Sequence, residues 1–240
     1  MKLKVINPNT TASMTAKIGA VARAAAAPGT EIIACNPARG PVAIEGHYDE
    51  ALCVPGVLAE VLKGEQEGVA GYAIACFGDP GLLAAREIAR GPVLGIAEAA
   101  MRAASFLATG FSVVTTLSRT RIIAEHLVQA YGLERTCRHI RTTDLAVLDL
   151  EQSGTQARQV ILQECQRALT EDGSGAIVLG CAGMADLATD LSQTLEVPVI
   201  DGVGAAVKFL EALVGLGLQT SKRGDLAPPL RIFAPKHPSV

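Results

Sequence analysis

The chain has 240 residues, of which 49% are hydrophobic and 3% aromatic, and its formal net charge is −3 at pH 7. This charge and the small number of aromatic side chains argue against a nucleic-acid-binding protein, which needs a basic surface and stacking platforms. Pro8 interrupts the N-terminal apolar segment, and the longest uncharged run, residues 103–118, contains Gly110, so we expect neither an export signal nor a membrane span. We therefore expect a cytoplasmic protein whose cysteines are reduced and whose partners include neither membranes nor nucleic acids.

Short runs rich in Val and Ile alternate along the chain with Ala- and Leu-rich segments of helical length. The predicted strands are residues 2–6, 31–35, 71–76, 92–96, 111–115, 176–181 and 197–200. The predicted helices are residues 12–26, 50–65, 80–90, 97–108, 119–131, 154–171, 185–195 and 203–217. This alternation is typical of an α/β protein whose parallel sheets are covered by helices on both faces. The Pro-rich residues 222–240 are predicted to form an extended tail over the surface.

Three segments recur in order at an offset of about 105–108 residues. The matched pairs are residues 4–11 with 112–120, 74–78 with 179–183, and 92–100 with 198–206. Either all α/β units look alike, or the chain consists of two pseudo-symmetric subdomains, each a mostly parallel sheet flanked by helices. We favour the second interpretation, with subdomain 1 at residues 1–97, completed by residues 206–240, and subdomain 2 at residues 98–205. Ligands bind at the carboxyl ends of parallel strands, so the active site is expected in the cleft between the halves.

Two of the six cysteines occupy equivalent positions in this repeat. Cys76 and Cys181 each end a predicted strand, and each is followed two residues later by Gly. A helix beginning after each cysteine would place unpaired N–H groups beside the thiol and lower its pKa. Two such thiols across a cleft could remove a proton from one face of a carbon and return it to the other. Asp79 is interpreted as the N-cap of the helix after Cys76, with Pro80 as its first residue.

The alternative for any cysteine is that it is a small buried hydrophobe. We prefer this interpretation for the four that lack a partner in the repeat, which are Cys35, Cys53, Cys137 and Cys165. The histidines show no metal-ligand spacing, so we expect no metal. They are His47, His126, His139 and His237. Gly202 and Gly204 form half of a dinucleotide fingerprint, which does not support a nucleotide cofactor. Residues 7–11 and the pair Thr115 and Thr116 follow predicted strands, where they could line a site or cap a helix.

Five segments of the chain resemble the hydantoin racemases, a group within the aspartate/glutamate racemase superfamily. They are residues 6–11, 44–50, 75–81, 114–116 and 178–184, and the resemblance extends over about residues 3–217. It implies two similar α/β subdomains around a cleft, a small-molecule substrate, no cofactor and a homo-oligomer. It makes Cys76 and Cys181 the acid/base pair of a two-base racemisation. It also implies a set of ring-binding residues, which are Asn9, Ile44, Gly78, Thr116, Ala182 and Gly183.

The residues after the two cysteines bear on the substrate. Amino-acid racemases of the superfamily carry polar residues there, whereas this chain has Phe77-Gly78 and Ala182-Gly183. Such neighbours suit a neutral ring, so we expect a 5-monosubstituted hydantoin, with Phe77 and Ile44 near the 5-substituent. Allantoin, itself a 5-substituted hydantoin, is the closest alternative. A more distant alternative is a decarboxylase or cis–trans isomerase on the same fold. Arylmalonate decarboxylases keep only one of the two cysteines, so the presence of both here argues against a decarboxylase. A further alternative is a non-enzymatic binding protein with inert thiols.

Overall fold

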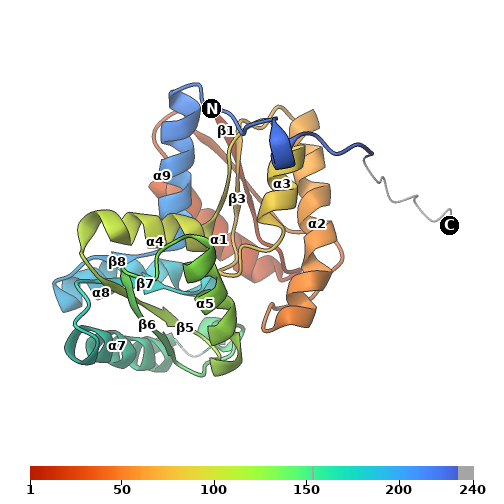
Figure 1. The fold of residues 1–240 in the computed structure, drawn as a ribbon. Coiled ribbons are helices and arrows are strands. Elements are labelled where there is room, and N and C mark those ends of the chain that lie inside the picture. Colours follow the sequence, from red (N-terminus) through yellow and green to blue (C-terminus); the bar gives the residue numbers. More distant parts are fainter. Residues whose placement is uncertain (153, 232–240) are drawn as a thin grey trace.

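The computed structural model describes residues 1–152 and 154–231, which form two stacked halves, each built on a four-stranded parallel sheet (Figure 1). The first sheet has the order β2-β1-β3-β4, and its strands are Glu31–Cys35, Lys2–Ile6, Gly71–Ile74 and Val93–Gly95. The second has the order β6-β5-β7-β8, and its strands are Cys137–Thr142, Phe111–Thr115, Ala176–Leu179 and Val199–Ile200. Each strand thus has a counterpart in the other half, which confirms the predicted fold class.

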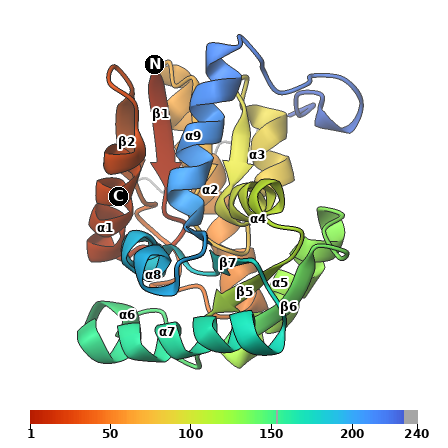
Figure 2. The same ribbon diagram turned by 90° about the vertical axis from the view of Figure 1, so that its left-hand side faces the viewer.

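Helices join these strands and cover both sheets (Figure 2). Those of the first half are α1 (Ala12–Ala25), α2 (His47–Gln66) and α3 (Leu82–Ile88). The others are α4 (Ile96–Leu107), α5 (Arg121–Ala130), α6 (Asp149–Gln152), α7 (Gly154–Glu171), α8 (Ala188–Leu195) and α9 (Gly202–Gly215). Short 3-10 helices span Ser118–Thr120, Ala182–Leu187 and Gly224–Leu226. Within the described residues, no helix combines the length and apolarity needed to cross a bilayer.

Strand β6 is an element that the sequence pattern did not predict. It lies at the edge of the second sheet and pairs on one side with β5. Two of its side chains, Arg138 and His139, are exposed, and Arg141 forms ion pairs with Glu171 and Asp172. An edge strand with charged side chains lacks the apolar run that marks a buried strand, and its charges discourage edge-to-edge association.

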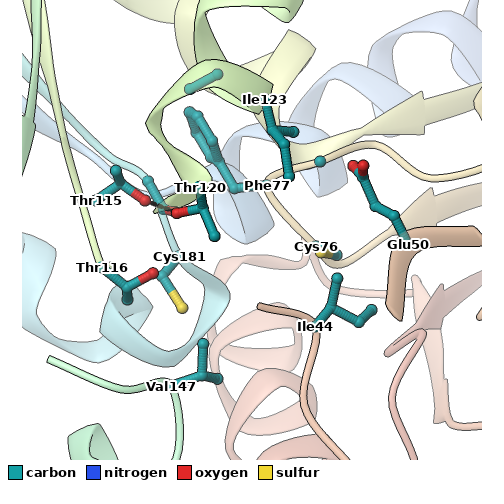
Figure 3. Close-up of a pocket in the computed structure, with 13 residues that line it drawn as sticks. Ile44, Glu50, Cys76, Phe77, Thr115, Thr116, Thr120, Ile123, Val147 and Cys181 are labelled. Carbon is teal, nitrogen blue, oxygen red and sulfur yellow. Dashed lines mark hydrogen bonds between the residues drawn. The ribbon is translucent and has the colours of Figure 1, made fainter. Parts of the chain in front are cut away.

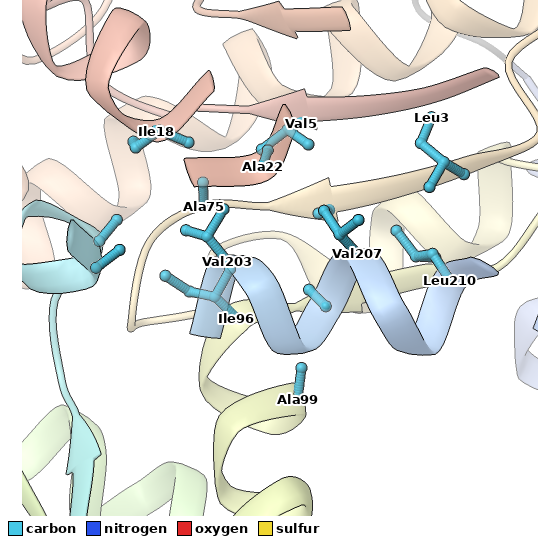
Figure 4. Close-up of a cluster of buried hydrophobic side chains, with 14 of the residues drawn as sticks. Leu3, Val5, Ile18, Ala22, Ala75, Ile96, Ala99, Val203, Val207 and Leu210 are labelled. Carbon is cyan, nitrogen blue, oxygen red and sulfur yellow. The ribbon is translucent and has the colours of Figure 1, made fainter. Parts of the chain in front are cut away.

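Two helices each follow the last strand of one sheet and pack on the other sheet. Helix α9 follows the last strand of the second sheet but packs on the first, where Val203, Val207 and Leu210 join Leu3 and Val5 in one buried cluster (Figure 4). Helix α4 follows the last strand of the first sheet but packs on the second. It contributes Ala97, Ala100, Met101 and Ala104 to a second buried cluster, which also contains Phe111 and Val178 of the second sheet. On this packing we retain, as a proposal, the division into residues 1–97 with 206–240 and residues 98–205.

The C-terminal tail is described as far as residue 231, and residues 232–240 lie outside the described residues. Its described part and the residues just before it contact α3 and the loop between α3 and β4. Lys222 donates hydrogen bonds to the carbonyls of Arg86 and Glu87, and the Thr220 hydroxyl donates to the carbonyl of Gly91 at 2.7 Å. This described part of the tail therefore contacts the first half.

Candidate active site

A cavity of about 50 Å³ lies between the halves, at the carboxyl ends of β3, β5 and β7 (Figure 3). The first half contributes Ile44, Glu50, Cys76, Phe77 and Gly78. The second contributes Thr115, Thr116, Thr120, Ile123, Ala124, Val147, Gly180 and Cys181. This volume is smaller than the roughly 150 Å³ of a cavity that holds benzene, and the cavity is partly open to solvent. A ligand the size of one ring would therefore extend beyond the cavity as it stands, or require the two halves to move apart.

Cys76 and Cys181 lie in turns that have the same backbone hydrogen-bonding pattern. Each follows its strand by two residues, and its carbonyl accepts a hydrogen bond from the N–H three residues later. These bonds run from Asp79 to Cys76 and from Met184 to Cys181, both at 3.0 Å. The two thiols therefore reach one cavity from equivalent places in the two halves, as the repeat predicted.

In each turn the sulfur also accepts a backbone hydrogen bond from the second residue after it. Gly183 N lies 3.4 Å from Cys181 Sγ, and the N–H of Gly78 binds Cys76 in the same way. These bonds lower the thiol pKa values, but burial outweighs them. Burial raises the pKa of Cys181 from its ordinary 9.0 to about 11 and the pKa of Cys76 well above 9.0.

The prediction of lowered cysteine pKa values is therefore wrong. It assumed that a helix begins directly after each thiol. Instead, α3 begins at Leu82, and the chain after Cys181 forms a 3-10 helix. The sulfurs receive one N–H group each rather than the dipole of an α-helix, and this is less than the cost of desolvating a thiolate.

The two thiols differ in the charges around them. Lys17, on α1, lowers the pKa of Cys181, whereas Glu45 raises it. In the described structure, the ionisable groups that act most strongly on Cys76 are Cys53, Cys181 and Glu50, and all three raise its pKa. A thiolate is thus less unfavourable at Cys181 than at Cys76.

Among the described residues that line the cavity, Glu50 supplies the one carboxylate. Burial raises its pKa, and the His47 ring, 3.5 Å away, partly offsets this. A Cβ atom on Gly78 would lie 2.3 Å from Glu50 Oε1, so the absence of a side chain at Gly78 makes room for this carboxylate.

The chain is similar to proteins of known activity over most of its length. The family described as Asp/Glu/Hydantoin racemase matches residues 3–210. A hydantoin racemase from Pseudomonas sp. (strain NS671) is 52% identical over 222 residues, which is 92% of this chain and 89% of the relative. The chain belongs to the Asp/Glu/hydantoin racemase family. It is therefore a racemase, an isomerase, and the resemblance found in the sequence is confirmed.

Solved racemase structures agree with this assignment. The allantoin racemase from Klebsiella pneumoniae superposes with a TM-score of 0.95 at 59% identity, covering 97% of this chain and 95% of that one. A glutamate racemase from Francisella tularensis shares the fold, with a TM-score of 0.63 at 16% identity over 95% of this chain and 85% of that one. The fold is thus common to racemases of different substrates, and the cavity must distinguish among them.

Of the seven predicted substrate-binding residues, which are the six implied by the resemblance and Phe77, four line the cavity: Ile44, Phe77, Gly78 and Thr116. The other three, Asn9, Ala182 and Gly183, lie outside the lining formed by the described residues. The Asn9 side chain accepts hydrogen bonds from Asn7 Nδ2 at 2.8 Å and from the N–H of Thr11 at 2.9 Å, before α1. Ala182 is buried in the core of the first half. Ligand binding by these three residues stays a prediction.

Several lining residues of this racemase were not predicted. Thr120 ends the 3-10 helix before α5, Ile123 and Ala124 come from the first turn of α5, and Val147 comes from the loop after β6. The sequence carried a signal for one further residue, Glu50, because it ends a segment that resembles the hydantoin racemases. No motif marked the α5 residues, because an apolar side chain that lines a cavity has the same sequence pattern as one in a core.

Asp79 differs from the prediction in its role. It does not cap α3, and its backbone is left-handed, with φ 45°. Its carboxylate instead accepts hydrogen bonds from the N–H groups of Ala97 at 3.0 Å and Glu98 at 2.9 Å, at the beginning of α4. It also accepts one from the Tyr131 hydroxyl, in the second half, at 2.6 Å. A Cβ on Gly95 would lie 2.0 Å from Asp79 Cγ, so only glycine fits there. Asp79 thus fixes the Cys76 turn to both halves.

This carboxyl group should make the stability of the racemase depend on pH. Burial raises the pKa of Asp79 from 3.8 to about 6, although three hydrogen-bond donors oppose this. The folded protein therefore binds this proton more tightly than the unfolded chain, and the resulting stabilisation is complete below pH 3.8 and lost as pH rises through 6. Relative to Asp79→Asn, the wild-type free energy of unfolding should increase by about 2.4 kcal/mol between pH 7 and pH 4.

Urea unfolding of both proteins across this pH range would measure the effect. The other carboxyl groups and histidines are common to the two chains, so their titration cancels in the difference. A difference that does not change with pH would show that Asp79 titrates at its ordinary value in the folded protein.

Proposed function

We propose that this racemase interconverts the enantiomers of 5-monosubstituted hydantoins without a cofactor, using Cys76 and Cys181 as its two bases. The observation that carries the proposal is the placement of these thiols on equivalent turns, from opposite halves, at one cavity. The hydantoin racemase relative at 52% identity supports the substrate class. The residue after each cysteine, Phe77 or Ala182, is apolar, which suits a neutral ring.

The chemistry follows from the position of the reacting hydrogen. The C5–H bond of a hydantoin lies beside the C4 carbonyl, so removal of the proton leaves an enolate. One cysteine, as the thiolate, takes this proton, and the other, as the thiol, gives its own proton to the opposite face of C5. The carbon is inverted, and the two cysteines end with their protonation states exchanged. The raised pKa values make each thiolate a stronger base, which suits a weakly acidic C–H bond.

A solvent-exchange experiment tests the proposal. One enantiomer of a 5-substituted hydantoin is incubated with the enzyme in deuterated water. The optical rotation should decay to zero while deuterium enters C5, because each inversion replaces the original proton with one from a solvent-equilibrated thiol. The double variant Cys76→Ser/Cys181→Ser serves as the control for spontaneous exchange. Rotation that persists with no deuterium at C5, for all hydantoins tested and for allantoin, would sink the proposal.

Allantoin is a second candidate substrate, favoured by the carboxylate of Glu50. The 5-substituent of allantoin is a ureido group, whose N–H groups can donate hydrogen bonds to a carboxylate, whereas an alkyl substituent cannot. Glu50 lies at the cavity together with apolar side chains such as Ile44 and Ile123. The similar allantoin racemase structure, at 59% identity, points the same way.

Glu50→Gln separates the two candidates. If the carboxylate binds a ureido group, kcat/KM for allantoin should fall about tenfold, the effect of weakening a charged hydrogen bond. The value for 5-isobutylhydantoin should change less than threefold, so the ratio of the two is the measurement. Glu125→Gln, on the exposed side of α5, is the matched control. Equal changes for both substrates would show that Glu50 does not select the substituent.

A further inference from the structure

Lys17 crosses from the first half to the turn that follows Cys181. It belongs to α1, and its ammonium donates a hydrogen bond to the carbonyl of Gly183 at 2.6 Å. The same ammonium forms an ion pair with Asp186, with Nζ 2.9 Å from Oδ1. The Lys17 side chain is 22% exposed, and that of Asp186 is 47% exposed. A largely buried cation is thus held against the backbone of one of the two cysteine turns.

This contact fixes the residue that binds the sulfur. Gly183 donates its N–H to Cys181 Sγ at 3.4 Å, and its carbonyl accepts from Lys17. Gly183 is therefore held on both sides, and its N–H is kept pointing at the sulfur. The positive charge of Lys17 lies close enough to favour the thiolate of Cys181, and Glu45, from the loop before α2, opposes it.

The turn after Cys76 has the same backbone hydrogen bonds but different partners. Its link to the other half is the Asp79 carboxylate, which accepts from the Tyr131 hydroxyl. The carboxylate at the cavity near Cys76 is Glu50, whose negative charge disfavours a second negative charge on this sulfur. The repeat therefore preserves the geometry of the two turns and not their electrostatics.

We propose that Lys17 is a positioning residue that makes the two thiols inequivalent: it orients Gly183 and places a positive charge beside Cys181, so that when the free enzyme loses one thiol proton, Cys181 becomes the thiolate and Cys76 stays protonated. This rests on the proposed two-cysteine mechanism. The singly deprotonated enzyme then reacts first with the enantiomer whose C5–H faces the second half. Cys181 takes that proton and Cys76 gives up its own, and exchange with solvent restores the thiolate at Cys181.

Thiol labelling tests the inequivalence without any substrate. Wild-type protein is treated with iodoacetamide between pH 7 and pH 9, and peptide mapping gives the rates at Cys181, Cys76 and, as a reference, Cys137. Because the thiolate is the reactive form, Cys181 should react faster than Cys76. Lys17→Met should lower the ratio of the Cys181 rate to the Cys76 rate about threefold. At a fixed pH, each unit of increase in the thiol pKa lowers the thiolate fraction tenfold, and the greater nucleophilicity of a less acidic thiol offsets about half of this effect on a logarithmic scale.

Two further variants distinguish charge from a loss of structure. Lys17→Arg keeps the charge and should keep the ratio near the wild-type value. Asp186→Asn leaves the Lys17 charge without its counter-charge and should raise the ratio. A ratio that is unchanged in Lys17→Met, or that falls in Asp186→Asn as well, would overturn the proposal, since a merely structural contact predicts the same direction for both variants.

The outcomes also separate this inference from the proposed function. If the wild-type protein racemises hydantoins while the labelling ratio does not respond to Lys17→Met, the inference about Lys17 fails alone. If the ratio responds as expected but neither hydantoins nor allantoin are racemised, the proposed function fails and the charge difference between the two thiols stands.

Discussion

Cys76→Ser and Cys181→Ser are each expected to abolish racemisation, with kcat/KM falling by about 10³-fold or more. A serine hydroxyl has nearly the size of the thiol but is a far weaker acid. It can neither hold a negative charge at neutral pH nor transfer a proton to C5 at a useful rate. Inversion needs a base on one face and an acid on the other, so a single remaining cysteine cannot complete it. Polarimetry on one enantiomer of a 5-substituted hydantoin measures the loss.

The same variants should still exchange the C5 proton with solvent on one face of the ring. The remaining cysteine can still remove a C5 proton that faces it and return a deuteron from solvent to the same face. Cys76→Ser should therefore exchange deuterium into one enantiomer, Cys181→Ser into the opposite one, and neither should invert the carbon. Cys137→Ser, whose thiol lies on the edge strand β6 and binds the carbonyl of His139, is the control and should retain full activity. Racemisation at the wild-type rate by either single variant would refute the two-base assignment.

The position of the two thiols was predictable because a duplicated fold repeats its chemistry at a fixed offset. The Cys–x–Gly pattern follows β3 in the first sheet and β7 in the second, and ligands bind at the carboxyl ends of parallel strands, so the repeat predicted that Cys76 and Cys181 face one cavity between the halves. The strands themselves were predictable where they are buried on both faces. The charged edge strand β6 was not, and with it the position of Val147 in the cavity remained unknown.

Electrostatics was the part that local sequence could not predict. The pKa of a thiol depends on its burial and on charges that arrive from distant parts of the chain. Lys17 is far from Cys181 in sequence, and nothing near either residue indicates that they meet. Asp79 shows the same limit. Followed by Pro80, it has the pattern of an N-cap for the next helix, but its carboxylate binds the beginning of α4 and Tyr131 instead.

Asp79→Ala is expected to lower the free energy of unfolding by about 3–5 kcal/mol at pH 7. The side chain accepts three hydrogen bonds in a place that water does not reach, since Asp79 is 5% exposed. Alanine would leave the N–H groups of Ala97 and Glu98 and the hydroxyl of Tyr131 without this acceptor. An unsatisfied buried polar group costs about 1–3 kcal/mol, and the loss of a helix cap about 1 kcal/mol. The carboxylate is itself costly to bury, which keeps the net loss below the sum of these values.

Three companion variants identify the source of this loss when all are compared by urea unfolding. Asp79→Asn keeps one acceptor and tolerates the left-handed backbone at φ 45°, so it should lose less stability than Asp79→Ala. Asp79→Gly also loses the carboxylate but relieves the backbone, and should be more stable than Asp79→Ala by about 1 kcal/mol. Tyr131→Phe removes one donor and leaves both backbone hydrogen bonds to Asp79, so its loss of stability should be the smallest.

A loss of less than 1 kcal/mol in Asp79→Ala would mean that the Cys76 turn is held by its own backbone. The hydrogen bonds from α4 and Tyr131 to the Asp79 carboxylate would then have no part in positioning the Cys76 thiol. A turn that keeps its conformation without the Asp79 side chain does not depend on contacts with the second half.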